Sequence, residues 1–206
     1  AAGDAIFSFL PLEWHIWKLP AEVFLILFLT VLNSRGVRES ILVMAPIFFI
    51  FLLTHVILIA SGIISHAPQL PATLSTAHND FDAGLNLLGW GGLILIFIHA
   101  YSLGGGTYTG IESIANGTPN MREPRVKTAK RTMIYSAISL AFTASGLLLC
   151  YLLWNVASVP GKTMNAVLIG KIVTEVPLGG AFVIITLISE GALLIVAALS
   201  GFVAGP

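Results

Sequence analysis

The sequence predicts an all-α integral membrane protein. Of its 206 residues, 56% are hydrophobic and only 10% are charged, and its mean hydropathy is +0.93. Several apolar stretches approach the roughly 20 residues that a helix needs to cross a bilayer. A helix satisfies its backbone hydrogen bonds within the segment, as the hydrocarbon interior requires. We therefore expect a single transmembrane domain over residues 1–206.

The apolar stretches predict the spans in order. Residues 1–11 read as the end of a cut helix. The chain opens AAGDAIFSF, without an initiator Met or a leader pattern, so we expect a fragment of a longer protein. The remaining predicted spans are 19–33, 41–64 with a kink at Pro46, 85–117 interrupted by glycines, 132–156 and 178–203.

Three polar stretches separate these spans. Residues 66–82, HAPQLPATLSTAHNDFD, contain Pro, His and Asp but no Lys or Arg, and predict an aqueous loop. Residues 158–176 predict a short interfacial helix. Residues 118–131 predict a polar, basic connector before the span 132–156.

Basic residues predict the orientation in the cell membrane. Arg35 and Arg38 lie within 34–40, and five more basic residues follow the glycine cluster: Arg122, Arg125, Lys127, Lys130 and Arg131. Because Lys and Arg concentrate in cytoplasmic loops, we expect loops 34–40 and 118–131 to be cytoplasmic in a multi-pass protein. The second cluster could also contact anionic lipid or serve as an inner gate.

A glycine cluster interrupts the span 85–117. The stretch SLGGGTYTGIESIANG covers residues 102–117, and a break in a membrane helix frees backbone N–H and C=O groups to bind an ion or a carboxylate. We predict a discontinuous helix at 104–110 that binds a small solute or ion. Its binding residues would be Gly104, Gly105, Gly106, Thr107, Tyr108, Thr109 and Gly110. Close helix packing through Gly106 and Gly110, or a potassium-channel filter, are the alternatives.

Three acidic residues are candidates for coupling transport to an ion gradient. A carboxyl inside a membrane is unfavourable unless it is protonated or paired. Glu190, which follows Thr186 by four residues on one helical face, could bind a proton or form a neutral hydrogen bond to another helix. Glu112 could bind a cation, although anchoring its half-helix is the favoured role. Asp4 is the third candidate, and His55 and His99 are expected to be hydrogen-bonded packing residues.

The composition excludes several other classes. A net charge of zero argues against nucleic-acid binding. The single cysteine, Cys150, offers neither a disulfide nor a metal cluster. The spans contain no Ser-His-Asp, paired-carboxylate or HExxH arrangement, so we expect no catalytic residues, no metal and no cofactor.

Three stretches resemble a known family. YSLGGGTYTGIESIANGTPNMREPRVKTAKRTM resembles the sixth helix and following loop of amino acid-polyamine-organocation superfamily permeases, particularly the branch related to KUP-type potassium importers. LNSRGVRES resembles the turn between their helices four and five, and SEGALLIVAALSGFVAGP resembles their eighth helix. The last match departs at Leu199 and Ala204, where relatives often carry polar or acidic residues, which weakens an expectation of ion coupling through that helix.

The resemblance runs from the end of helix three to helix eight and implies a LeuT-like fold of inverted repeats. It implies a substrate held between broken helices one and six, with Thr107 and Thr109 lining the site. Missing helices of the same chain would supply the other half.

The predicted function is secondary active transport of a small solute. Amino acids are the first expectation, with proton or cation coupling, and the membrane lipids are the other partners. A potassium/proton symporter of KUP-like type is the alternative. A membrane scaffold or an integral membrane enzyme is the alternative from another class.

Overall fold

The computed structural model describes residues 2–8, 10–34, 41–105, 114–115, 118, 121–175 and 179–203. The described residues form helices and turns and contain no strand, which confirms the all-α class. Two helical stretches within them, Pro46–Gly104 and Arg125–Leu153, are long and apolar enough to cross a membrane, and Gly179–Ile195 is apolar but shorter. The chain divides into two compact units, residues 1–65 with 142–206 and residues 66–141.

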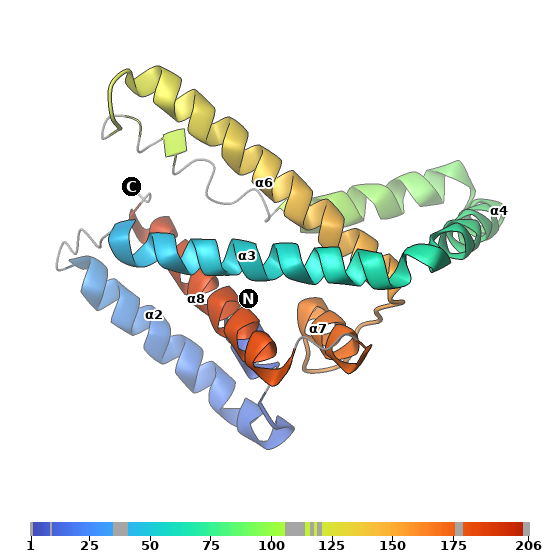
Figure 1. Ribbon diagram of the computed structural model, residues 1–206, viewed down its shortest axis with the longest axis horizontal. Helices are drawn as coiled ribbons and strands as arrows, with labels where there is room; N and C mark the ends of the chain where they lie inside the picture. The colour runs from blue at the N-terminus through green and yellow to red at the C-terminus, as the bar shows by residue number, and fades with distance from the viewer. Residues whose placement is uncertain are drawn as a thin grey trace. The chain divides into compact units, whose positions relative to one another are not determined.

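The helices have the bounds α1 Ala2–Phe7, η1 Leu12–Trp17, α2 Lys18–Ser34, α3 Ile41–His66, η2 Ala67–Gln69, α4 Leu70–Gly104, α6 Arg125–Leu153, α7 Met164–Glu175 and α8 Gly179–Val203. Figure 1 labels α2, α3, α4, α6, α7 and α8. The 17 residues of α2 cover the segment predicted at 19–33, and at 1.5 Å per residue they extend about 26 Å. Arg35 and Arg38 lie outside the described residues.

Residues 66–82 differ from the sequence prediction. His66 ends α3 and the rest form η2 and the first turns of α4, so the expectation that these residues form a loop was wrong. Pro68 and Pro71 contributed to that prediction together with the His and Asp residues, but each proline lies at the first or second position of its helix. A proline there removes only an N–H that has no partner within the helix, and its fixed φ suits the first turn.

Helix α4 is interrupted at Gly89. Its φ of 65° and ψ of 176° lie in a region that only glycine adopts readily. The two parts of α4 run in different directions (Figure 1), and the rings of Phe81 and Trp90 meet edge to face at 6.2 Å between centroids. A Cβ at Gly92 would lie 2.7 Å from the Cβ of Leu88. The GWGG stretch therefore breaks the span predicted from residue 85.

Helix α6 begins at Arg125, within the connector predicted over 118–131. Lys and Arg are good helix formers, and Pro124 directly precedes the first turn. The N–H of Thr128 donates to the carbonyl oxygen of Pro124 at 3.0 Å, and its hydroxyl donates to that of Arg122 at 3.1 Å. Basic residues thus occupy the first turns of the helix as well as the segment before it.

Two features end α6: a residue in the left-handed backbone conformation directly after the helix, and hydrogen bonds from a side chain of α7. Asn155 has a φ of 45°, and the N–H of Val156 donates to the carbonyl oxygen of Tyr151 at 2.9 Å, as in a Schellman motif. Lys171 of α7 donates to the carbonyl oxygens of Trp154 at 2.9 Å and Asn155 at 2.8 Å. These bonds satisfy carbonyl groups that the helix end would otherwise leave without donors.

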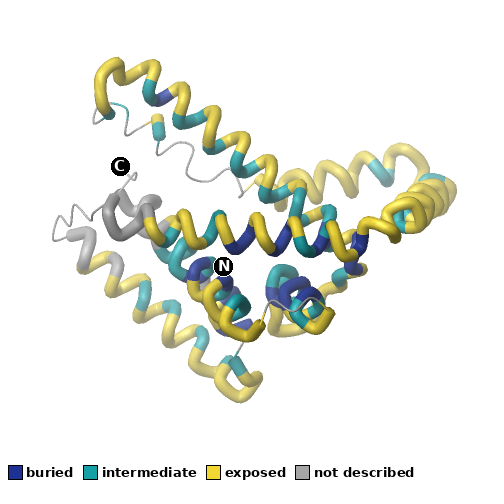
Figure 2. Tube along the Cα trace, in the orientation of Figure 1, coloured by how far each residue is buried: buried dark blue, intermediate teal, exposed yellow. Residues whose placement is uncertain are grey.

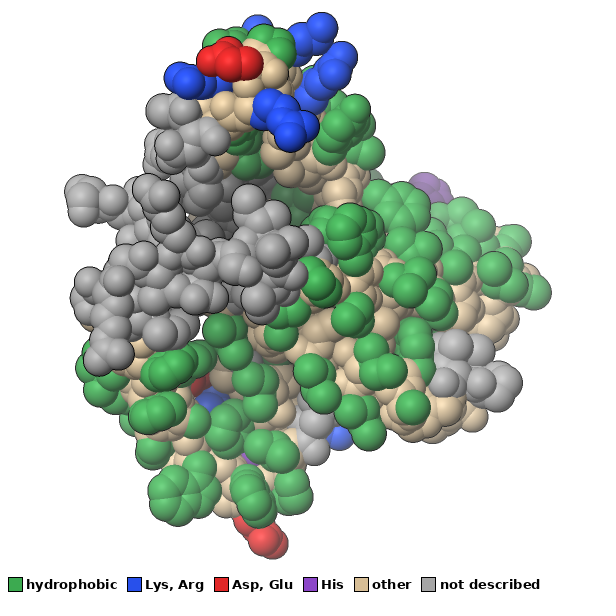
Figure 3. Space-filling view, turned by 60° about the vertical axis from the view of Figure 1, so that its left-hand side comes forward, with side chains coloured by type: hydrophobic (Ala, Val, Ile, Leu, Met, Phe, Trp, Pro, Cys, Tyr) green, Lys and Arg blue, Asp and Glu red, His purple; other side chains and the backbone are tan. Residues whose placement is uncertain are grey.

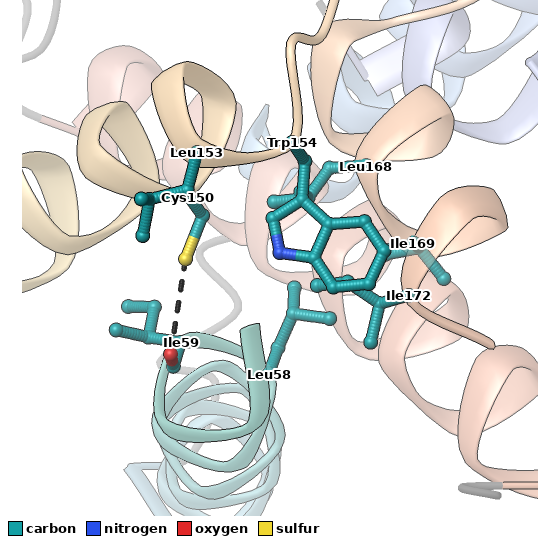
Figure 4. Close-up of a cluster of buried hydrophobic side chains, with 8 residues drawn as sticks. All are labelled: Leu58, Ile59, Cys150, Leu153, Trp154, Leu168, Ile169 and Ile172. Atoms are coloured by element: carbon teal, nitrogen blue, oxygen red, sulfur yellow. Dashed lines mark hydrogen bonds between the residues drawn. The ribbon is translucent and has the colours of Figure 1, made fainter. Parts of the chain in front are cut away.

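The main hydrophobic core joins α3, the end of α6 and α7. Its buried members are Leu58, Ile59, Cys150, Leu153, Trp154, Leu168, Ile169 and Ile172 (Figure 4). The indole N–H of Trp154 donates to the carbonyl oxygen of Gly62 at 3.0 Å. Figure 2 shows buried residues along α3 and α7. Residues 158–176, predicted to hold an interfacial helix, thus contribute a helix with one face in this core.

Two glycines allow α3 and α6 to approach closely. A Cβ at Gly146 of α6 would lie 2.8 Å from Cγ2 of Ile59. A Cβ at Gly62 of α3 would lie 3.0 Å from Sγ of Cys150 and 3.1 Å from Cδ1 of Ile172. Small residues permit such close packing between membrane helices, where dispersion replaces the hydrophobic effect as the attractive force.

We expect Gly146→Ala to lower the free energy of unfolding of the full-length protein by about 1–3 kcal/mol, because the new methyl group overpacks the contact with Ile59. Thermal unfolding and SDS titration in bicelles would measure it. Gly170→Ala is the matched control, since a Cβ there meets no described atom within 4 Å. Gly170→Ala should leave the free energy of unfolding unchanged or raise it by up to about 1 kcal/mol, because alanine favours a helix more than glycine does. Equal effects of the two substitutions would contradict close packing at Gly146.

Candidate functional site

The structure describes the start of the predicted binding site. Helix α4 ends at Gly104, the first glycine of the cluster. Gly105 has φ −58° and ψ −29°, and its N–H donates to the carbonyl oxygen of Ser102. A Cβ at Gly104 or Gly105 would meet no described atom within 4 Å, so packing among the described residues does not require glycine at either position.

The rest of the cluster lies outside the described residues. These positions are Gly106, Thr107, Tyr108, Thr109 and Gly110, together with the coupling candidate Glu112. The discontinuous helix at 104–110 and the packing alternative through Gly106 and Gly110 therefore stay predictions.

Glu190 takes part in a chain of hydrogen bonds between three helices. Its Oε1 on α8 accepts a hydrogen bond from Nδ2 of Asn165 on α7 at 3.0 Å. Oδ1 of Asn165 in turn accepts a hydrogen bond from the hydroxyl of Tyr151 on α6. All three side chains are partly buried. We call these three residues the Tyr151–Asn165–Glu190 chain.

The sequence did not reveal this arrangement. Thr186 lies one turn from Glu190, as the spacing predicted, but its fully buried hydroxyl donates to the carbonyl oxygen of Phe182 at 2.8 Å. Asn165 and Tyr151 were missed because their partner lies far away in sequence. The available signal was an amide and a phenol in otherwise apolar helices, where polar groups are expected to find partners.

The amide group of Asn165 orients the carboxyl of Glu190. An amide has distinct donor and acceptor ends, and Tyr151 occupies the acceptor end of Asn165. The donor end therefore faces Oε1 of Glu190, which can accept this bond whether the carboxyl is ionised or protonated. Such a carboxyl can gain or lose a proton while the hydrogen bond to α7 persists.

Helix α1 packs against α8 beside this chain. A Cβ at Gly191, the residue after Glu190, would lie 3.0 Å from Cγ1 of Ile6. The buried positions Ala5 and Phe7 also lie on α1. The absence of a side chain at Gly191 thus lets α1 approach α8 next to the carboxyl.

Asp4, the third coupling candidate, forms an ion pair with Lys18 at the start of α2. The side chains of Asp4 and Lys18 are 48% and 34% exposed. They line a polar pocket of about 320 Å³ with Ser8, His15, Lys162 and Thr163 among its walls. Because two lysines accompany the single carboxylate, the pocket is a poor site for a cation. Asp4 is better explained as a structural partner of Lys18.

The two histidines within spans have different surroundings. His55 is fully buried, its Nδ1 lies 2.9 Å from the carbonyl oxygen of Phe51, and its ring lies against the Phe51 ring. Nε2 of His55 has no hydrogen-bond partner among the described residues. His99, by contrast, is exposed on α4. The described part of the chain holds no group of three or more metal-ligating His, Cys, Asp or Glu residues.

A comparison with known proteins identifies one relative. The potassium transporter KimA of Bacillus subtilis (strain 168) is 29% identical over 209 aligned residues, which include all of this chain and 32% of that protein. The chain therefore spans about a third of the length of this curated relative. No family model matches the sequence.

Proposed function

We propose that the chain is part of a secondary active transporter that moves potassium across the cell membrane. The observation that carries the proposal is the similarity of the whole chain to the potassium transporter KimA. The helical stretches Pro46–Gly104 and Arg125–Leu153, each of which contains a segment apolar enough to cross a membrane, support a membrane location. The same similarity favours potassium over amino acids, which were the first expectation from the sequence.

The proposed site is the discontinuous helix at 104–110. Potassium in proteins is coordinated by carbonyl and hydroxyl oxygens that replace its hydration shell. A broken helix frees carbonyl groups, and Thr107 and Thr109 add hydroxyl groups beside them. Helix α4 leads directly into this segment, whose described members are Gly104 and Gly105. In this proposal other helices of the full-length protein complete a LeuT-like site.

The proposed topology is multi-pass, with loops 34–40 and 118–131 on the cytoplasmic side. The excess of Lys and Arg in these two segments supports this orientation. Helix α6 fits it, because its basic residues come first and its remaining turns are apolar.

We further propose that Glu190 couples potassium movement to protons. Intramembrane carboxyl groups are rare, and many belong to proton pathways. The hydrogen bond from Asn165 holds the carboxyl of Glu190 in one orientation, and Tyr151 fixes the amide group in turn. Glu190 can therefore bind a proton without a rearrangement of its neighbours.

The proposed ion site predicts that Thr107→Val reduces potassium transport at least tenfold. Valine keeps the shape of threonine but removes the hydroxyl oxygen, so an ion ligand is lost. Uptake of a rubidium tracer by the full-length protein in proteoliposomes, under an inward proton gradient, measures the effect. Thr76→Val is the matched control, because the Thr76 hydroxyl on α4 donates to the carbonyl oxygen of Ala72 within its own helix.

Wild-type liposomes that accumulate labelled amino acids and exclude rubidium would contradict potassium transport. Normal rubidium uptake by both Thr107→Val and Gly105→Leu, with normal membrane insertion, would contradict the site at 104–110 alone.

The coupling proposal predicts that Glu190→Gln makes rubidium uptake independent of the proton gradient. Glutamine retains an acceptor oxygen for Asn165 but cannot release a proton at physiological pH. Glu13→Gln, at an exposed position in η1, should leave the response unchanged. The ratio of uptake with and without an imposed gradient is the measured quantity. If this ratio is the same in Glu190→Gln and wild type, Glu190 does not carry the coupled proton.

A further inference from the structure

Five basic side chains gather at the start of α6. They are Arg122, Arg125, Lys127, Lys130 and Arg131, and all five residues are exposed. The hydrogen bond from Thr128 to the carbonyl oxygen of Arg122 holds the preceding segment against the first turn of α6. Figure 3 shows the Lys and Arg side chains together, with one acidic group among them. We call these five residues the basic cluster.

The basic cluster does not stabilise α6. Cations near a helix N-terminus interact unfavourably with the helix dipole. Lys127 is three and four residues from Lys130 and Arg131, so these like charges also repel one another. The acidic neighbour, Glu123, pairs with Arg125 at 3.0 Å in an exposed position. Most of the positive charge is therefore available to an external anion.

The same face of α6 continues as apolar surface. Five residues are spaced so that they share one face of the helix: Lys127, Lys130, Arg131, Ile134 and Ile138. Ile134 is 55% exposed and Ile138 is 61% exposed. At 1.5 Å per residue, Ile138 lies about 10 Å along the axis from Arg131.

The opposite face of α6 is turned toward protein. Thr128, Thr132 and Met133 are partly buried there, and Ala129 is buried. The charged and apolar surfaces thus form one continuous exposed stripe.

We propose that this stripe binds an anionic phospholipid. Lys127, Lys130 and Arg131 of the basic cluster contact the phosphate headgroup, and the acyl chains lie along Ile134 and Ile138. A free phosphate would use the charges alone, whereas a phospholipid also covers the apolar part of the stripe. Basic clusters at the ends of membrane helices attract anionic lipid at about fivefold in affinity per charge, equivalent to about 1 kcal/mol. The proposal is independent of the transported substrate.

Site-specific quenching in nanodiscs tests the proposal. A fluorescent non-canonical residue replaces Ile138 in the full-length protein, and brominated phosphatidylglycerol is compared with brominated phosphatidylcholine at equal mole fraction. We expect stronger quenching by the anionic lipid. The control label replaces Leu148, which is 64% exposed on the same helical face and about 26 Å beyond Arg131. There the two lipids should quench equally.

Substitutions that remove single charges identify the side chains that bind the anionic lipid. Each of Lys127→Gln, Lys130→Gln and Arg131→Gln should lower the relative affinity for the anionic lipid about fivefold. Lys127→Arg with Lys130→Arg keeps the charge and should keep the selectivity. Higher ionic strength should weaken it.

Equal quenching by the two lipids at position 138 of the otherwise wild-type protein would overturn the proposal and leave membrane orientation as the role of the cluster. Selectivity that persists in all three glutamine variants would also overturn it. Replacing chloride by inorganic phosphate at constant ionic strength should change nothing. Loss of selectivity in phosphate would show that the cluster binds soluble phosphate instead of lipid.

Discussion

The arrangement of α6, α7 and α8 depends on the need to pair polar groups inside an apolar structure. Tyr151, Asn165 and Glu190 lie one on each helix and satisfy one another in a chain of two hydrogen bonds. A buried polar group that loses its partner destabilises a protein by about 1–3 kcal/mol. The short helix α7 contributes the central member, so its position is linked to both neighbours.

Further hydrogen bonds connect α7 and the end of α6 to the core. Lys171 of α7 donates to the carbonyl oxygens of Trp154 and Asn155, the two residues that follow α6. Trp154 follows at the end of α6 and donates to the carbonyl oxygen of Gly62 on α3. The apolar residues Leu168, Ile169 and Ile172 then fill the space between these contacts. The hydrogen bond from Asn165 thus connects the proposed proton-binding carboxyl of Glu190 to a well-packed helix, which keeps the carboxyl in one orientation.

Local sequence patterns predicted the helices better than their interruptions. Helix α2 was located closely because nearly all of residues 23–32 within it are apolar. The expected loop at 66–82 was wrong because prolines at helix starts resemble prolines in loops. The break at Gly89 was missed because the hydropathy of LNLLGWGGLILIF continues across it. A positive φ at a glycine does not change the hydropathy of the sequence, so hydropathy cannot reveal it.

The sequence predicted only those parts of the candidate site that a short segment of the chain reveals by itself. The glycine cluster and Glu190 were visible in the sequence because both interrupt apolar runs. The partner of Glu190 was not visible, since Asn165 lies 25 residues away and on another helix. Only the packing of α7 against α8 brings the amide and the carboxyl together.

A double-mutant cycle between Asn165 and Glu190 tests the central interaction most directly. The free energy of unfolding of the full-length protein in bicelles would be measured for wild type, Asn165→Ala, Glu190→Ala and the double variant. We expect a coupling energy of about 0.6 kcal/mol, the average that double-mutant cycles give for hydrogen bonds between membrane helices, and at most about 1.7 kcal/mol. Additive effects, within about 0.3 kcal/mol, would show that the two side chains do not stabilise one another and would contradict this account.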